Sequence, residues 1–98
     1  MKIITLLDNS TFTVYVEGRL DTTTAPELDK ELENIPSSVT EIIFDFANLE
    51  YISSAGLRIL LKIIRQFPEA GTVKIRNANA DVRDIFNITG FIDLLTLI

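Results

Sequence analysis

Two adjacent serines, Ser53 and Ser54, have the residue type and the position at which this chain could most readily carry a chemical modification. They lie in the segment YISSAGL at 51–57, where an apolar stretch gives way to a helical pattern. The first N–H groups of a helix lack intrahelical acceptors and the helix dipole is positive there, so an anion is stabilised at this point. A phosphate on either serine, with about −1.5 to −2 charges, could accept hydrogen bonds from these groups. The same pattern also fits a serine that only caps the helix while Gly56 allows close packing.

A second polar cluster, GRLD at 18–21 followed by three threonines at 22–24, lies between a predicted strand and a predicted helix. Aspartate and threonine in such a turn often bond to the nearby backbone, which gives Asp21 a purely structural explanation. Loops that follow the carboxyl ends of neighbouring parallel strands share one edge of a sheet. If the first and third predicted strands are neighbours in the sheet, or nearly so, the two loops can lie at the same end of it, and Asp21 is then expected near Ser54.

The remaining candidates for catalysis are weak. Asp45 ends an apolar strand, as the phospho-acceptor aspartate of receiver domains does, but no acidic pair follows the first strand to hold Mg²⁺, so we interpret Asp45 as structural. The chain has no histidine and no cysteine, which excludes thiol nucleophiles, disulfides, the usual zinc sites and histidine bases. It also lacks a glycine-rich phosphate loop. We therefore expect no catalytic residue, no metal site, no bound cofactor and no enzymatic activity.

The composition limits the partners and the compartment. With 98 residues, the chain is expected to form one domain over 1–98. Its net charge of −5 argues against nucleic acid as a partner, because binding phosphates requires clustered cations. The apolar start is short and no run approaches eighteen apolar residues, so we expect no membrane association and a cytoplasmic location.

The elements that position these residues follow from the hydrophobic periodicity and the turn signals. The predicted fold is α/β, with a mixed sheet of four to five strands, at least three helices and the order β-β-α-β-α-β-α-β. The expected strands are 3–7, 11–17, 42–46, 73–75 and a short one at 95–98. The expected helices are 24–35 with a capping box at Thr24–Glu27, 54–67, and one that Asn79 caps and Gly90 ends.

The helix predicted at 54–67 has three distinct faces. A basic face repeats at i, i+4 and i+7, at Arg58, Lys62 and Arg65. Ile59 and Ile63 form a second apolar edge, which either packs under the third helix or the loops, or binds a partner. The predicted buried stripe comprises Leu57, Leu60, Leu61, Ile64 and Phe67.

Taken together, these segments resemble the STAS domain, the family named for sulfate transporters and anti-sigma factor antagonists. The resemblance extends over essentially the whole chain, and its motifs occur in the family's order and spacing. The matching residues are GRLD at 18–21, Thr24, Ala25, Leu28, IFD at 43–45, YISSAGL at 51–57, Ile85, Phe86, and TGF at 89–91.

The resemblance implies an anti-sigma factor antagonist that works by partner switching. An anti-sigma factor with serine kinase activity would supply the ATP and phosphorylate Ser54, with Ser53 as a minor alternative, and a serine phosphatase would reset the protein. The unphosphorylated form would bind the anti-sigma factor, as a monomer or weak dimer, and so regulate transcription. The alternative is a phosphorylation-independent STAS module in a larger sensory or transport-associated complex. The expected partner-binding residues are Asp21, Thr22, Thr23, Ser53, Ser54, Ala55, Gly56, Leu57, Arg58, Ile59 and Lys62.

Overall fold

The computed structural model describes residues 1–98 and contains six β-strands, three α-helices and one short 3-10 helix. The element order follows the sequence prediction, with one additional strand. The strands are β1 (Lys2–Asp8), β2 (Thr11–Leu20), β3 (Glu41–Asp45), β4 (Leu49–Ile52), β5 (Val73–Arg76) and β6 (Thr96–Leu97). The helices are α1 (Ala25–Leu32), α2 (Ser54–Gln66), α3 (Ala80–Thr89) and the 3-10 turn η1 (Phe91–Asp93).

The hairpin predicted at the start of the chain is confirmed. β1 and β2 pair antiparallel along the whole of β1, and Asn9 in the turn has a left-handed backbone with φ of 56°. The strict alternation of polar and apolar residues in β2 places its apolar side chains on one face of the sheet. Phe12, Val14 and Val16 are buried there.

The main sheet has the strand order β1-β2-β3-β5-β6, in which β1 is antiparallel to β2 and the other neighbours are parallel. β4 pairs separately with the end of β2, beyond a register shift between Gly18 and Arg19. Gly18 has φ of +94°, a conformation that glycine adopts readily, and the resulting bulge lets the two halves of β2 pair with different strands. The six strands exceed the four to five predicted, because the sequence pattern does not distinguish the short β4 from a loop.

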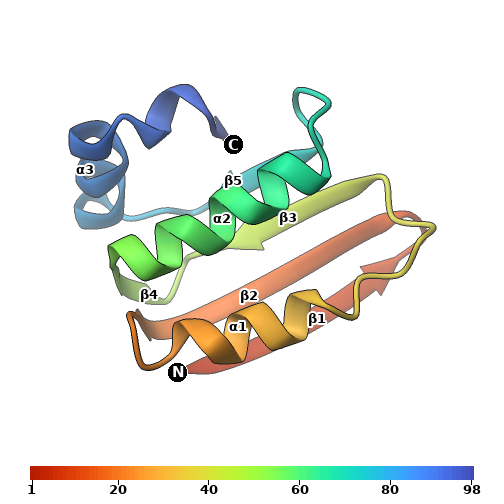
Figure 1. Ribbon diagram of the computed structural model, residues 1–98, viewed down its shortest axis with the longest axis horizontal. Coiled ribbons are helices and arrows are strands. Elements are labelled where there is room, and N and C mark those ends of the chain that lie inside the picture. Colours follow the sequence, from red (N-terminus) through yellow and green to blue (C-terminus); the bar gives the residue numbers. More distant parts are fainter.

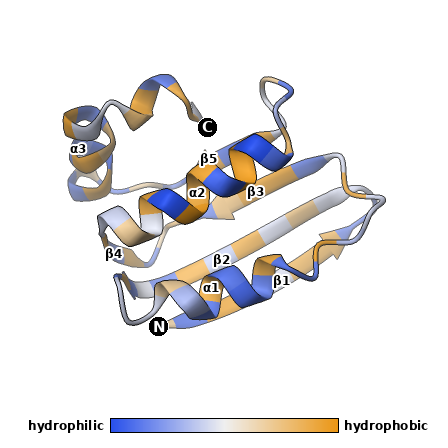
Figure 2. Ribbon diagram, viewed as in Figure 1, coloured by the Kyte–Doolittle hydropathy of each residue, from blue (hydrophilic) through white to orange (hydrophobic).

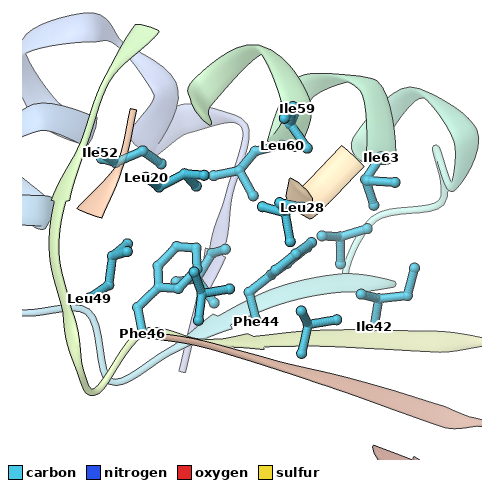
Figure 3. Packing of buried hydrophobic residues seen from close by; sticks show 14 of the residues in the cluster. Leu20, Leu28, Ile42, Phe44, Phe46, Leu49, Ile52, Ile59, Leu60 and Ile63 are labelled. Carbon is cyan, nitrogen blue, oxygen red and sulfur yellow. The ribbon is translucent and has the colours of Figure 1, made fainter. Parts of the chain in front are cut away.

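The helices α1 and α2 lie side by side across one face of the sheet, while α3 lies beside β4 (Figure 1). Figure 2 shows alternating hydrophobic and hydrophilic bands along α1 and α2, as expected of helices with one buried face. A single cluster of 22 buried residues fills the space between helices and sheet. Figure 3 shows Leu28 of α1, Leu60 of α2 and Phe44 of β3 in this cluster. None of the helices is long and apolar enough to cross a bilayer.

Strand β3 is covered in different ways on its two faces. Its apolar run predicts a central strand covered on at least part of both faces, and β3 is indeed central, between β2 and β5. Ile42 and Phe44 are fully buried toward the helices. Ile43 points to the opposite, helix-free face and is only half-buried. The helices therefore cover one face of β3, and neighbouring side chains shield the other.

The helix ends agree with the sequence prediction at α3 and differ at α1. The side chain of Asn79 accepts a hydrogen bond from the N–H of Val82 at 2.9 Å, and Gly90 ends α3 in a left-handed conformation, as expected. Helix α1 ends at Leu32, earlier than predicted, and the capping box does not form. The Thr24 hydroxyl instead accepts a hydrogen bond from the N–H of Asp21 at 2.9 Å and donates to the carbonyl of Arg19 at 2.7 Å, and it does not cap α1.

Helix α2 is rolled about its axis relative to the predicted orientation. Leu61, Ile64 and Phe67 are only half-buried, whereas Ile59 and Ile63 are buried in the core. Ile63 lines the small hollow between α1 and α2. The second apolar edge of α2 therefore packs toward α1, and not under the third helix or the loops.

Candidate functional site

The two polar loops meet at one end of the molecule, as the sequence predicts for loops that follow neighbouring parallel strands. Leu20, the last residue of β2, pairs with Ile52, the last residue of β4. The N–H of Ser53 donates to the carbonyl of Leu20 at 2.8 Å. This backbone hydrogen bond places the loop that starts with Asp21 beside the start of α2, where Ser54 lies.

The two serines at the start of α2 have different environments. Ser53 occupies the N-cap position with an extended backbone, but its side chain makes no capping hydrogen bond. Its hydroxyl oxygen is buried and has no hydrogen-bond partner. Ser54, the first residue of the helix, is exposed. The simple capping role that the sequence allows for one of the serines is therefore not observed.

Gly56 lies against the core and brings α2 close to the ends of β2 and β4. A Cβ atom at this position would lie 2.7 Å from Cγ of Leu20 and 2.8 Å from Cγ1 of Ile52. Such distances are far below ordinary van der Waals contact, so only glycine fits without a shift of its neighbours. The close-packing interpretation of Gly56 is confirmed.

The structure corrects the expected partner-binding surface at three positions. Gly56 is buried, Leu57 is 4% exposed and Ile59 is 8% exposed. All three face the core because the buried side of α2 includes them, so little of their surface is available to a partner in the folded protein. Their contribution is to hold the helix in place, which leaves the exposed neighbours as the candidate surface.

Asp21 organises the threonine loop through hydrogen bonds to the backbone and side chains that follow it. One carboxylate oxygen, Oδ1, accepts from the N–H of Thr23 at 3.0 Å, from the Thr23 hydroxyl at 2.7 Å and from the N–H of Thr24 at 3.2 Å. The hydrogen bond from the Thr23 hydroxyl is the largest of several effects that hold the pKa of Asp21 below its usual value of 3.8. The structural role that the sequence suggests for Asp21 is confirmed, and Thr22 remains exposed in the same loop.

The exposed side of α2 carries the basic residues predicted from its periodicity. Arg58 lies one turn after Ser54 and is exposed, as is Lys62 one turn later. Lys62 Nζ contacts Asp29 Oδ1 of α1 at 2.8 Å, and this hydrogen bond raises the pKa of Lys62. Arg58 forms no salt bridge, so its charge is available beside Ser54. Ala55, between the two faces, is half-buried against the core.

Exposed Arg19 and half-buried Tyr51 form a further feature that the sequence prediction does not include among the partner-binding residues. The guanidinium carbon of Arg19 lies 4.5 Å from the centroid of the Tyr51 ring, a cation–π arrangement. The two residues are partners in the β2–β4 register. The pairing could be found from the sequence only once β4 is recognised as a strand, because Arg19 and Tyr51 then share a face.

Asp45 has a structural role, as interpreted from the sequence. Its carboxylate accepts hydrogen bonds from the N–H of Ala47 at 3.0 Å, from Nε of Arg76 at 2.9 Å and from Nδ2 of Asn77 at 3.2 Å. These contacts join the ends of β3 and β5 on the helix-free face. No group of three or more acidic side chains lies close enough together to hold a metal ion.

Comparison with known proteins gives a consistent family assignment. The STAS domain family model matches residues 2–98. A protein of Bordetella bronchiseptica named "Putative anti-sigma factor antagonist BtrV" is 30% identical over 81 residues, which cover 81% of this chain and 70% of that protein.

Solved structures of the same kind share the fold. The anti-sigma factor antagonist SpoIIAA in its unphosphorylated form has a TM-score of 0.82 and 21% identity, over 99% of this chain and 88% of that one. An anti-sigma factor antagonist from Mycobacterium paratuberculosis has a TM-score of 0.86 and 20% identity, over 98% of this chain and 83% of that one. Bacillus SpoIIAA in its phosphorylated form has a TM-score of 0.74 and 20% identity, over 99% of this chain and 91% of that one. With a family model that spans residues 2–98 and a curated relative at 30% identity, the chain belongs to the STAS domain family.

Proposed function

We propose that this protein is a cytoplasmic anti-sigma factor antagonist that is switched by phosphorylation of Ser54. In its unphosphorylated form it binds an anti-sigma factor with serine kinase activity, and a sigma factor is released. That kinase, using its own ATP, phosphorylates Ser54 and so ends the complex, and a serine phosphatase restores the binding form. The proposal needs no catalytic group in this chain. It rests on the family assignment and on the contrast between the two serines.

The exposure of Ser54 is the observation that carries the choice of acceptor. A kinase must reach the hydroxyl oxygen, and Ser54 is exposed while the Ser53 hydroxyl is buried. The first N–H groups of α2 have no intrahelical acceptor, and the side chain of Ser53 does not cap them. A phosphate on Ser54 therefore meets hydrogen-bond donors and the positive end of the helix dipole.

The effect on binding follows from charge and desolvation. A phosphate adds about −1.5 to −2 charges at neutral pH, and burying it in an interface is costly unless cations pair with it. A partner surface that accepts a neutral serine hydroxyl provides no such cations. Phosphorylation of Ser54 is therefore expected to dissociate the complex.

Phosphate transfer and binding test the proposal separately. The protein is incubated with the anti-sigma kinase and ATP, and its intact mass and tryptic peptides are measured. We expect one phosphate, on Ser54, which Ser54→Ala abolishes and Ser53→Ala preserves. In titration calorimetry, Ser54→Asp should bind the anti-sigma factor at least about tenfold more weakly than the unmodified protein.

Two results would contradict the proposal. If no phosphate is added and Ser54→Asp binds as the unmodified protein does, the chain is a phosphorylation-independent STAS module. If the phosphate is found on Ser53, the local structure must open to expose that hydroxyl, and Ser54 is not the acceptor.

A further inference from the structure

Strand β1 forms an edge of the sheet that no other element covers. It stands at the end of the strand order, with β2 as its only partner, and six of its seven residues are exposed (Figure 1). The outer side of such a strand presents a row of unpaired backbone N–H and C=O groups, which can pair with a further strand.

The edge also lacks the usual features that prevent such pairing. Proteins protect exposed edges with proline, bulges or charged residues in the middle of the strand. β1 pairs with β2 without a bulge, contains no proline, and has charged residues only at its two ends. Three of the six exposed large hydrophobic residues of the chain lie on this strand: Ile4 at 46%, Leu6 at 53% and Leu7 at 46%.

The sequence of β1, KIITLLD, is complementary to itself when it is read in the opposite direction. In an antiparallel pair of two β1 strands centred on Thr5, Lys2 of each copy lies opposite Asp8 of the other. On the same basis, Ile3 lies opposite Leu7, Ile4 lies opposite Leu6, and the two copies of Thr5 face each other. Residues that face each other in an antiparallel pair project to the same face of the sheet, so each of these pairs can make contact.

Other registers fit this sequence less well. In an antiparallel pair, two residues that face each other either both direct their N–H and C=O groups at the partner strand or both direct them away from it. A shift by one residue would face a residue of the first kind with one of the second, so the two strands could not form hydrogen bonds in that register. Centring the pair on Ile4 or on Leu6 leaves at least one end charge without its counterpart. The register centred on Thr5 uses all seven residues and pairs both end charges.

We propose that two copies of this chain associate through β1 in the antiparallel register centred on Thr5. The two main sheets, each of five strands, then form one continuous sheet of ten. Ile4 and Leu6 of both copies make a four-residue apolar cluster on the helix-free face. On the helix face, Leu7 of each copy covers Ile3 of the other. We assign a second copy of the chain to this edge because Lys2 and Asp8 at the two ends of β1 then face Asp8 and Lys2 of the other copy.

This association is independent of the proposed switching function. β2 separates β1 from the other strands, and β1 has substantial contact with no other element. Ser54 lies at the start of α2, so it remains exposed in the dimer. Each dimer would thus present two separate copies of the site.

Charge reversal with rescue tests the pairing. We expect Asp8→Lys and Lys2→Glu, each alone, to raise the dimer dissociation constant about tenfold, because each places like charges opposite each other at both ends. An equimolar mixture of the two variants should recover the original dissociation constant, since both end pairs are again of opposite charge in the mixed dimer. Asp84→Lys, which makes the same charge change on exposed α3, should leave self-association unchanged. Sedimentation equilibrium distinguishes 11.0 kDa monomers from dimers.

A disulfide tests the register, because the chain contains no cysteine. The Cα atoms of the two facing Thr5 residues would lie about 4.5 to 5.5 Å apart, within the range of a disulfide, so Thr5→Cys should form covalent dimers on mild oxidation. In Asp8→Cys the two cysteines would lie about 20 Å apart and should not cross-link. The proposal is wrong if the unmodified protein stays monomeric at the highest attainable concentration, if the mixture fails to recover association, or if both cysteine variants cross-link equally.

Discussion

The hydroxyls of Ser53 and Ser54 are chemically identical and adjacent, but the fold exposes one and buries the other. Ser53 is held by its own backbone, through the hydrogen bond to Leu20, so its side chain points into a space that offers no partner. Ser54 begins the helix and faces away from the core. Residue chemistry alone cannot choose between the serines, because the choice depends on the direction in which the strand enters the helix. The resemblance to the STAS domain is what implies Ser54.

Substitution of Ser53 tests this difference without any partner. A buried hydroxyl without a hydrogen-bond partner costs about 1 to 3 kcal/mol of desolvation. We therefore expect Ser53→Ala to leave the free energy of unfolding unchanged or to raise it by about 1 kcal/mol, measured by urea denaturation. Ser54→Ala should change it by less than about 0.5 kcal/mol, because the side chain is exposed. A loss of more than about 1 kcal/mol in Ser53→Ala would mean that its hydroxyl makes a stabilising bond.

At the scale of elements, Asp45 fastens the end of β3 to the end of β5. Burial of its carboxyl favours the neutral form, but the hydrogen bonds from Ala47, Arg76 and Asn77 together outweigh it, and the pKa of Asp45 lies below the usual 3.8. A carboxyl whose pKa is lower in the folded state stabilises the protein above its unfolded pKa. That stabilisation is lost as the pH falls from about 4 through the folded pKa.

We expect Asp45→Asn to lower the free energy of unfolding at pH 7 by about 1 to 3 kcal/mol, because it removes a charged acceptor from a buried network. Between about pH 6 and about pH 2, the free energy of unfolding of the variant should also fall less than that of the unmodified protein. Denaturant unfolding at the two pH values measures this difference. Glu50→Gln, a substitution at an exposed position of β4, serves as the control. An equal pH dependence in Asp45→Asn and the unmodified protein would contradict the assigned role of Asp45.

Element type and order could be predicted from the sequence, whereas the roll of α2 and the presence of β4 could not. Periodicity identifies a helix at 54–67 but does not decide which of its apolar residues are buried. Either Ile59 and Ile63 or Leu61 and Ile64 can face the core together with Leu57 and Leu60. The close approach of Gly56 to Leu20 and Ile52 selects one arc, and that contact is between distant parts of the chain. The short β4 depends likewise on its pairing with β2 beyond the bulge.

At the scale of the whole molecule, the charge distribution is strongly uneven. Helix α2 contains Arg58, Lys62 and Arg65 and no acidic residue, so it carries +3. Because the net charge is −5, the rest of the chain carries −8. A partner that docks over α2 is therefore expected to present acidic groups, although the molecule as a whole is acidic. A phosphate on Ser54 would cancel much of this local positive charge, which adds to its effect on the interface.

Two substitutions with the same net charge separate the local field from the total charge. Arg58→Glu and Arg83→Glu both change the net charge from −5 to −7, but only Arg58 lies beside Ser54. We expect Arg58→Glu to slow association with the anti-sigma factor about tenfold at low salt and to reduce the salt dependence of the rate. Arg83→Glu, on α3, should have a much smaller effect. Stopped-flow measurements over a range of ionic strength give both quantities, and equal slowing in the two variants would show that only the total charge matters.

The hydrogen bond between the N–H of Ser53 and the carbonyl of Leu20 has a consequence for the divergence of such proteins. Because both groups belong to the backbone, the bond survives replacement of almost any neighbouring side chain. Exposed residues around it, such as Arg19, Thr22 and Thr23, can therefore change while Ser54 keeps its position. Duplicated copies in one cell could in this way acquire separate partners, and remain insulated from each other, without any redesign of the common scaffold.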